Sequence, residues 1–375
     1  MLFKNAYVFT RSGRFVPGGF RVEEGCFAQV IDHVPEGEGL DLEGAHVIPG
    51  LIDLHTHGNS GADFSDGNYE GLVQMAGYLA KKGVTSFAPA SMTLPYEDLE
   101  RAFQTAKRLT EEQPEGCARL IGIQMEGPFF SEKKKGAQNG AYLREPDVEA
   151  FLKLYESCGG LVRIADVAPE LEGAEDFVRR VSELCTVSVA HTDADYDSAR
   201  KAFAAGARHL THLFNAMPPL HHRNPGVIGA AAEREDVVAE LICDGLHIHP
   251  SAVRAAYRLF PGRICLVSDS LRCCGMPDGP YMLGGQEVYL EGSIARLKDG
   301  TIAGSASDLY TCMRNAVAFG ISKEQAILSC TLIPAGELGR EAELGSIEPG
   351  KLADFIVCDG DLNRRAVYMG GVQIA

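Results

Sequence analysis

Two histidines one residue apart, His55 and His57, close the apolar run of residues 47–54. Alternate side chains of a β-strand point to the same face, so both imidazoles can converge on one metal ion. A histidine pair in a protein core or on its surface has the same spacing. Taken alone, the pair therefore leaves a metal site and a structural role open.

Four other apolar runs that read as strands each end in a polar residue: Glu126, His191, His212 and Asp269. In a parallel barrel the carboxyl ends of the strands meet at one mouth, where catalytic groups from several strands gather. We therefore expect these four side chains to share one cavity with the histidine pair. Imidazoles and carboxylates without thiolates favour a zinc, iron or manganese ion over copper or an iron–sulfur centre.

The remaining histidines differ in their positions relative to the strands. His247 lies just past the strand that ends near Asp244, so we expect it to face the same mouth and contact a substrate. His209 lies three residues before His212, and strand alternation predicts that it faces away from the site as a structural residue. His221 and His222 are predicted to be loop residues exposed to solvent.

The elements that position these residues follow a repeated order. Over residues 49–339, apolar β-branched runs alternate with helical patterns, which is typical of βα units around a parallel sheet. Eight such units fit a (β/α)8 TIM-type barrel of about 250 residues better than an open doubly wound sheet. The predicted strand ends lie near His55, Ala90, Glu126, Ala168, His191, His212, Asp244 and Asp269.

Both ends of the chain read as short strands separated by glycine and polar turns. Neither end can bury a core alone, so we expect them to form one small β-sandwich domain together. The predicted organisation is an α/β protein with this small domain over residues 1–48 and 340–375. The barrel domain then covers residues 49–339.

Composition excludes several classes of protein. The 375 residues include 35 Lys and Arg against 51 Asp and Glu, a net charge of −16, which disfavours nucleic acid and anionic membranes as partners. No signal peptide and no apolar run of about 18 residues is present, so we expect a cytoplasmic protein without a membrane span. The 11 cysteines lack a paired spacing and are predicted to be reduced thiols.

Longer motifs are spread over nearly the whole chain, at residues 49–58, 125–129, 134–137, 168–170, 211–217, 244–247, 266–269, 303–305 and 344–354. With these motifs the sequence resembles the amidohydrolase superfamily, and within it the deacetylases of phosphorylated N-acetyl amino sugars. The last motif is typical of the superfamily at large. The stretch Thr-His-Leu-Phe-Asn-Ala-Met at residues 211–217 is the most specific to the deacetylases.

The resemblance implies a reaction, which is removal of the acetyl group from N-acetyl-D-glucosamine 6-phosphate. It implies one or two divalent ions, with the main ion on Glu126, His191 and His212, and a second ion on His55 and His57 with Glu126 bridging. It also implies a homodimer in which the phosphate-binding arginine reaches into the neighbouring subunit. The implied roles are Asp269 as catalytic acid and base, His247 as catalytic substrate contact, Arg223 with the backbone of Asn215 and Ala216 as phosphate grip, and Ala137, Gln138, Ile302, Ala303 and Gly304 around the sugar.

Two departures from the family pattern bear on the substrate. Gln138 replaces a histidine that the family usually presents to the substrate, and glutamine can donate a hydrogen bond but carries no positive charge. Residues 271–274 replace residues that are generally small. A deacetylase of another acetamido sugar, such as N-acetylgalactosamine 6-phosphate, therefore stays as an alternative. A binding protein without catalysis is a remote alternative, because the expected ligands and Asp269 are all present. A dihydroorotase-like enzyme usually needs a carbamylated lysine on the fourth strand. Residues 162–168, which read as that strand, contain no lysine, so this enzyme class is disfavoured.

Overall fold

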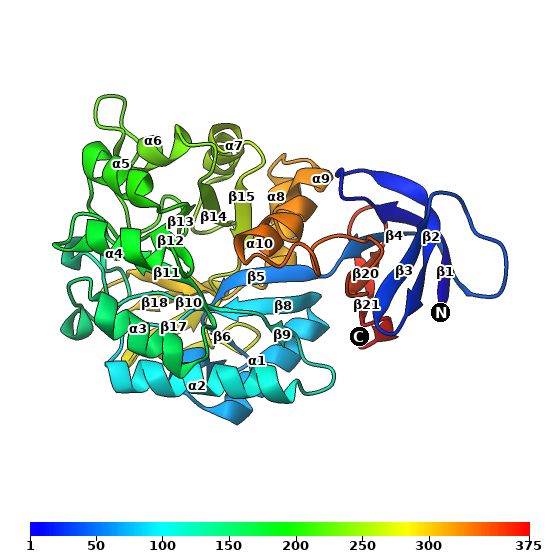
Figure 1. Ribbon diagram of the computed structural model, residues 1–375, viewed down its shortest axis with the longest axis horizontal. Coiled ribbons are helices and arrows are strands. Elements are labelled where there is room, and N and C mark those ends of the chain that lie inside the picture. Colours follow the sequence, from blue (N-terminus) through cyan, green and yellow to red (C-terminus); the bar gives the residue numbers. More distant parts are fainter.

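The computed structural model describes all 375 residues. Figure 1 shows strands from both chain ends side by side at one end of the molecule, with the N and C termini near each other. The rest of the chain forms a larger part in which helices surround a sheet. The chain enters this larger part at Gly50, between strand β4 (Leu40–Pro49) and strand β5 (Leu51–Thr56).

A curled parallel sheet occupies the centre of the larger part. Strands β10 to β15 pair in sequence order, and β5 pairs with β8, which pairs with β9, all in parallel. The parallel bridges Ala90–Gln124 and Thr56–Ser270 connect the two sets. This curled sheet is consistent with the predicted TIM barrel. Its strands after β5 are β8 (Val84–Pro89), β9 (Arg119–Leu120), β10 (Ile123–Met125), β11 (Val162–Val167), β12 (Thr186–Val189), β13 (His209–Leu210), β14 (Val238–Ile242) and β15 (Ile264–Val267).

The positions at which these strands end decide which residues meet at the mouth. Each of the eight predicted ends lies within two residues of an observed strand end. The sequence-based βα order is thereby confirmed. Glu126 directly follows β10, and His191, His212 and Asp269 each lie two residues past the ends of β12, β13 and β15.

Helices cover the outside of the parallel sheet (Figure 1). Their apolar faces are buried against it, as shown by Phe103 and Phe177, which are fully buried. Several begin at a capping side chain, such as Asp195, which accepts a hydrogen bond from the backbone N–H of Ser198. The helices are α1 (Tyr69–Lys81), α2 (Tyr96–Glu112), α3 (Val148–Ser157), α4 (Ala174–Val181), α5 (Tyr196–Ala205), α6 (Gly226–Ala232), α7 (Pro250–Leu259), α8 (Leu309–Ala318), α9 (Lys323–Leu328) and α10 (Leu332–Glu337).

The strands of the two chain ends share one seven-stranded sheet, in the order β22-β21-β20-β4-β1-β2-β3. Aromatic side chains fill its core, where the ring centroids of Phe3 and Phe20 lie 5.0 Å apart and those of Phe355 and Tyr368 lie 4.5 Å apart. The N-terminal and C-terminal segments are therefore joined in one sheet, whereas the predicted β-sandwich domain stays a prediction. Besides β4, its strands are β1 (Leu2–Phe9), β2 (Phe15–Glu23), β3 (Cys26–Ile31), β20 (Phe355–Cys358), β21 (Arg364–Met369) and β22 (Val372–Gln373).

An antiparallel sheet that the sequence analysis did not predict follows β15. It contains β16 (Gly279–Leu283), β17 (Gln286–Glu291), β18 (Ile294–Leu297) and β19 (Ile302–Ser305). Ser305, at the end of β19, bridges to Ser270 just beyond the end of β15. The last strand of the inserted sheet therefore returns to the mouth of the parallel sheet. Short elements complete the chain: β6 (Gly58–Asn59), β7 (Ala62–Asp63), η1 (Phe64–Asp66), η2 (Glu132–Lys134) and η3 (Gly140–Tyr142).

No helix in the structure combines the length and apolar character needed to span a bilayer. All eleven cysteines are free thiols.

Candidate metal and catalytic site

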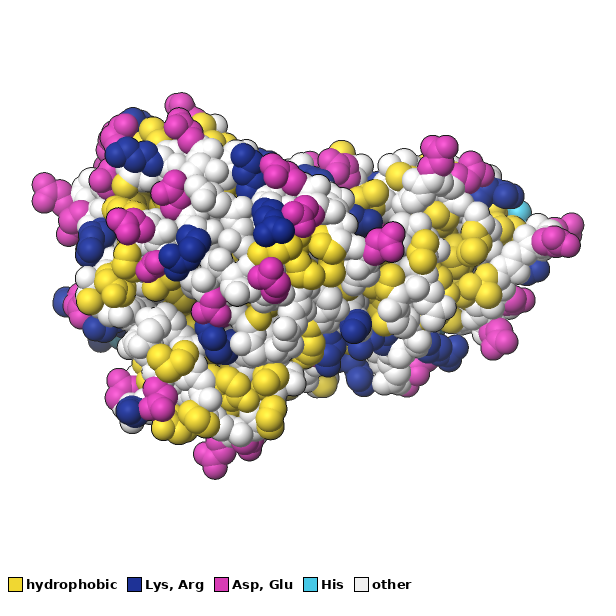
Figure 2. All heavy atoms as spheres, turned by 90° about the horizontal axis from the view of Figure 1, so that it is seen from below, with side chains coloured by type: hydrophobic (Ala, Val, Ile, Leu, Met, Phe, Trp, Pro, Cys, Tyr) yellow, Lys and Arg dark blue, Asp and Glu magenta, His cyan; other side chains and the backbone are white.

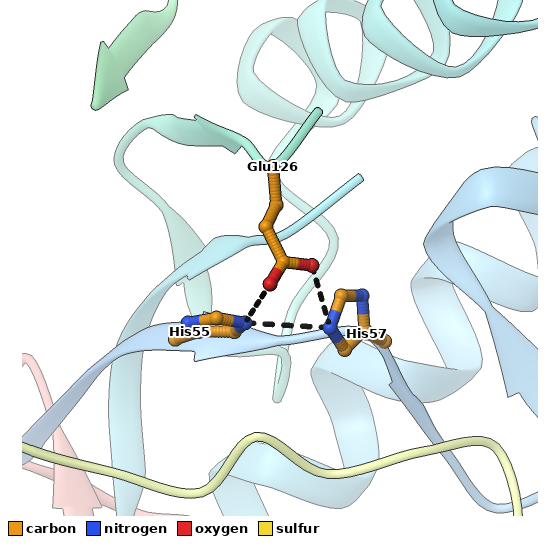
Figure 3. Close-up of side chains that lie close together, drawn as sticks. All are labelled: His55, His57 and Glu126. Atoms are coloured by element: carbon orange, nitrogen blue, oxygen red, sulfur yellow. Dashed lines mark hydrogen bonds and ion pairs between the residues drawn. The ribbon is translucent and has the colours of Figure 1, made fainter. Parts of the chain in front are cut away.

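His55 and His57 both lie at the end of β5, and both are buried. Figure 3 shows the two rings directed toward the carboxylate of Glu126. Their Nε2 atoms are 3.3 Å apart. The distance to the carboxylate is 3.7 Å from Nε2 of His55 and 3.3 Å from Nε2 of His57. The predicted His-x-His pair therefore converges on one point.

Two further imidazoles reach the same carboxylate from neighbouring strands. Nε2 of His191 lies 3.1 Å and Nε2 of His212 lies 3.2 Å from Oε1 of Glu126. Stacking on Phe130, with ring centroids 4.5 Å apart, holds the His191 ring. The structure therefore places the five predicted metal-ligand residues in one buried cluster, with Glu126 at its centre.

Left-handed backbone at three strand ends directs the polar side chains into the mouth. His191, His212 and Asp269 have φ values of 42°, 30° and 46°, a region that residues other than glycine rarely adopt. Backbone strain of this kind is concentrated at functional sites, where the surrounding structure maintains it. In each case the chain leaves its strand at the residue that carries the chemistry.

Hydrogen bonds at Nδ1 fix the orientation of the rings. Nδ1 of His57 lies 3.1 Å from the carbonyl of Ala90, and Nδ1 of His191 lies 2.8 Å from that of Lys134. A carbonyl only accepts, so Nδ1 carries the hydrogen in both rings, and a neutral ring then presents its Nε2 lone pair to the cluster.

The spacing of the inward atoms fits a metal ion. Nε2 of His191 and Nε2 of His212 are 3.1 Å apart, and Nδ1 of His212 has no hydrogen-bond partner, so Nδ1 of His212 can keep the hydrogen while both Nε2 atoms bind an ion. Nitrogen ligands at zinc distances of about 2.0–2.1 Å around a tetrahedral ion lie about 3.3 Å apart. Two overlapping groups have one ligand atom from each residue within 4.8 Å of one another, one of His55, His57 and Glu126 and one of Glu126, His191 and His212.

Asp269 lies at the edge of this cluster, just after β15. Its Oδ1 is 3.3 Å from Nε2 of His57 and 3.6 Å from Nε2 of His55. Burial opposes ionisation, but the hydrogen bond with His57 and the nearby charge of His55 hold the pKa of Asp269 below its usual value. Asp269 is therefore a carboxylate that can accept a proton at neutral pH.

His247 faces the same space from the loop after β14. Its Nδ1 bonds to Oδ2 of Asp244 at 2.7 Å, while Oδ1 of Asp244 accepts the backbone N–H of Leu246 and of His247, both at 2.9 Å. Burial favours a neutral ring, but the hydrogen bond and charge of Asp244 raise the pKa of His247 above its ordinary value. His247 can therefore donate a hydrogen bond into the cavity through Nε2.

A cavity of about 200 Å³ opens above the cluster. Residues that the sequence analysis did not identify also line it, namely Met92, Gly136 and Thr301. Arg223 is not among the lining residues, since its side chain is exposed and its Nη1 lies 2.8 Å from Nε2 of His222. The predicted residues that line the cavity are His57, Glu126, Ala137, Gln138, His191, His212, Asn215, Ala216, His247, Asp269, Ile302, Ala303 and Gly304.

Comparison with known proteins decides the family, because residues 46–373 match the Amidohydrolase family. The chain belongs to the amidohydrolase family. Amidohydrolases are generally metal-dependent, which agrees with the cluster around Glu126, and this amidohydrolase acts on an amide bond. The resemblance in the sequence is thereby confirmed.

Relatives of this amidohydrolase are deacetylases of amino-sugar phosphates. It is 39% identical over 321 residues to N-acetylglucosamine-6-phosphate deacetylase of Bacillus subtilis (strain 168), covering 84% of this chain and 81% of the relative. It is 32% identical over 366 residues to N-acetylgalactosamine-6-phosphate deacetylase of Escherichia coli O157:H7, covering 97% and 96%. The solved N-acetyl-D-glucosamine-6-phosphate deacetylase of Mycobacterium smegmatis superposes with a TM-score of 0.94 at 30% identity, over 100% of both chains.

Gln138 of the amidohydrolase lines the cavity, but both ends of its amide are already bonded. Its Nε2 donates to Oε2 of Glu126 at 2.8 Å, and its Oε1 accepts the backbone N–H of Thr93 at 2.7 Å. Gln138 therefore connects the central carboxylate to the loop after β8.

The prediction that His209 faces away from the site is wrong. Its ring is fully buried beneath the cluster, with Nε2 3.1 Å from Oε1 of Glu240 and Nδ1 2.7 Å from Oε2 of Glu337. Regular alternation does not extend from His209 to His212, because β13 ends at Leu210 and the backbone then turns. Glu240 was not among the predicted site residues, and its only signal in the sequence is a charge inside the apolar strand Val238–Ile242.

Proposed function

We propose that this amidohydrolase removes the acetyl group from N-acetyl-D-glucosamine 6-phosphate, giving D-glucosamine 6-phosphate and acetate. The observation that carries the proposal is the convergence of four imidazoles, Glu126 and Asp269 on one cavity. The names of its relatives supply the substrate class.

Glu126, His191 and His212 would hold the main ion, and His55 and His57 would hold a second ion with Glu126. Zinc is the ion that we propose, with iron or manganese as alternatives, because the ligands are nitrogen and oxygen. When bound, such an ion lowers the pKa of a water molecule and polarises the acetyl carbonyl.

The residues of the chain supply the proton transfers. Asp269 accepts a proton from the attacking water and then returns it to the amide nitrogen that leaves with the sugar. His247 donates a hydrogen bond from Nε2 to the acetyl oxygen, where negative charge develops. Asp244 stabilises the protonated ring of His247 through the 2.7 Å contact at Nδ1.

The rest of the cavity wall surrounds the sugar in this proposal. Ala137, Gln138 and the segment Ile302–Gly304 contact the hexose, and the backbone of Asn215 and Ala216 contacts the phosphate. Arg223 completes the phosphate site of the neighbouring subunit in a homodimer. Its exposed side chain, which lies outside its own cavity wall, supports that role.

The proposal extends to the organisation and location of the enzyme. The small terminal domain, over residues 1–48 and 340–375, is a β-sandwich in which the one seven-stranded sheet curls so that Phe27 of β3 packs against Phe355 of β20. Residues 49–339 form a closed (β/α)8 barrel. The buried aromatic cluster around Phe3 and Phe355 supports a separate core for the terminal domain.

The enzyme works in the cytoplasm, which the eleven free thiols support.

A second candidate substrate is N-acetylgalactosamine 6-phosphate. The E. coli O157:H7 deacetylase named for this sugar covers 97% of the chain, and Gln138 replaces the histidine of the family pattern. The two sugars differ only in the orientation of one hydroxyl group, so the choice between them depends on hydrogen-bonding groups in the cavity wall.

Acetate release from four sugars by one metal-analysed preparation tests the proposal. The sugars are the gluco and galacto 6-phosphates and their two unphosphorylated forms. Preference for the gluco 6-phosphate would support the main proposal, and preference for the galacto 6-phosphate would support the second candidate. No release from any of them by metal-loaded protein would contradict both.

A further inference from the structure

Glu240 is a fully buried carboxylate beneath the candidate metal cluster. It lies on β14, and its carboxylate accepts three hydrogen bonds from groups that belong to the cluster or lie next to it. Oε2 accepts from Nδ1 of His55 at 2.9 Å and from the backbone N–H of His212 at 3.0 Å, and Oε1 accepts from Nε2 of His209 at 3.1 Å. A buried charge is costly unless it is paired, and these three donors provide the pairing for the Glu240 carboxylate.

We propose that Glu240 is the positioning residue for the ion held by His55 and His57, an inference that rests on the proposed function. Glu240 retains the hydrogen on Nδ1 of His55, so the Nε2 lone pair of that ring points at the ion. Among the four imidazoles of the cluster, only His55 has its Nδ1 on a carboxylate. His57 and His191 have their Nδ1 atoms on carbonyl oxygens.

This difference in partner has a chemical consequence. A carboxylate behind a ligating imidazole makes the ring a stronger donor to the metal than a carbonyl does, and removing such a partner weakens metal binding about 10–100-fold. The bond to the backbone N–H of His212 also anchors the strand end that carries another ligand. One carboxylate thus connects β5 and the end of β13 beneath the two candidate ion positions.

His209 balances the charge of Glu240. Its two ring nitrogens face two carboxylates, Glu240 at 3.1 Å and Glu337 at 2.7 Å, so both nitrogens carry hydrogen and the ring is a cation. The order Glu337, His209, Glu240, His55 therefore forms a hydrogen-bonded chain from α10 to the cluster. The chain restrains the Glu240 carboxylate on the side away from His55.

Metal titration of the full chain tests the inference, with Glu240→Gln as the main variant. Glutamine keeps the size of the side chain, but both oxygens of Glu240 accept hydrogen bonds. In either orientation the NH₂ group of glutamine therefore faces an N–H donor, and at least one hydrogen bond is lost. We expect wild-type protein to bind two Zn²⁺ ions, measured by competition with a chromogenic chelator. In Glu240→Gln the second ion should bind about 10–100-fold more weakly, and the first ion, which keeps its three side-chain ligands, should be affected less. Glu240→Asp, which keeps the charge but shortens the reach, should also weaken the second ion and serves if the glutamine variant does not fold.

Asp166→Asn is the matched control for changing a buried acidic side chain to its amide, because Asp166 lies on β11 and bonds to Gln124 and Thr211 and to no ligand candidate. It should bind both ions as wild type does. Two ions with wild-type affinity in Glu240→Gln, or a single ion in wild type, would overturn the inference. Wild-type protein that binds no metal or releases no acetate would instead overturn the proposed function.

Discussion

Replacing Gln138 by leucine tests whether this side chain holds Glu126 in place. The change removes the donor to Oε2 of Glu126, which is 2.8 Å away, and the acceptor for the backbone N–H of Thr93, which is 2.7 Å away. A hydrogen bond to a charged group contributes about 1.5–3 kcal/mol, and an unpaired buried N–H costs about 1–3 kcal/mol. We therefore expect the free energy of unfolding to fall by about 4 kcal/mol in Gln138→Leu.

Far-UV circular dichroism during urea unfolding is the suitable assay, because the chain contains no tryptophan. The measurement uses protein freed of metal, so that no bound ion contributes to holding Glu126. Gln104→Leu is the matched control, since Gln104 lies on the exposed face of α2 and donates to Glu100 at 3.2 Å. The control should lose less than about 0.5 kcal/mol. A loss below about 1 kcal/mol in Gln138→Leu would refute the reasoning, because the two buried bonds would then contribute almost nothing.

The remaining predictions concern the catalytic carboxylate, the metal and a buried acid. Asp269→Asn should keep its metal but lose about 10²–10⁴-fold in kcat, and undiminished acetate release would exclude it as the proton carrier. Chelation should abolish acetate release and added Zn²⁺ should restore it, whereas a chelated enzyme that stays active would contradict the proposed metal. Burial raises the pKa of Asp166 from 3.8 to about 8, so between these values the folded chain keeps a proton that the unfolded chain releases. Stability must therefore fall as pH rises through this window, by up to about 1.4 kcal/mol per pH unit. In urea unfolding, the advantage of Asp166→Asn over wild type should grow from pH 4 to pH 8, and a constant difference would count against this pKa.

The site could be predicted because its residues occupy repeated positions. Glu126, His191, His212 and Asp269 each follow an apolar strand, and the mouth of the parallel sheet brings such positions together. The cavity wall formed by Ile302–Gly304 followed from the family resemblance rather than from any pattern of residues.

Three features were not predicted, two because no local pattern records them and one although the sequence carried a signal for it. Glu240 pairs with a residue 185 positions away, and no local pattern records which strands face each other across the interior. His209 was misplaced because strand alternation holds only while the backbone stays extended, and β13 is two residues long. The sheet β16–β19 did have a local signal, since Gly284 and Gly285 separate two alternating runs, which is typical of a hairpin turn.

Charge is distributed unevenly between the surface and the interior. Figure 2 shows Lys and Arg interspersed with Asp and Glu over the visible face, although the chain carries a net charge of −16. The positive groups that would bind a phosphorylated substrate in the cavity are therefore not supplied by a surface that is positively charged throughout. In the proposed function they come from single positions, namely the histidines, Arg223 of the neighbouring subunit and the ion that the cluster would hold.

The continuity of β4 and β5 has a consequence for the order of synthesis. β4 lies between β1 and β20 in the terminal sheet, and after Gly50 the same segment continues into the strand that carries His55 and His57. The segment Phe355–Cys358 leaves the ribosome about 300 residues after its partner, so one edge of β4 stays unpaired while the barrel strands are being made. A prematurely terminated chain would expose that edge next to the nascent active site. Such an edge is a target for chaperones and for aggregation until Phe355–Cys358 pairs with it.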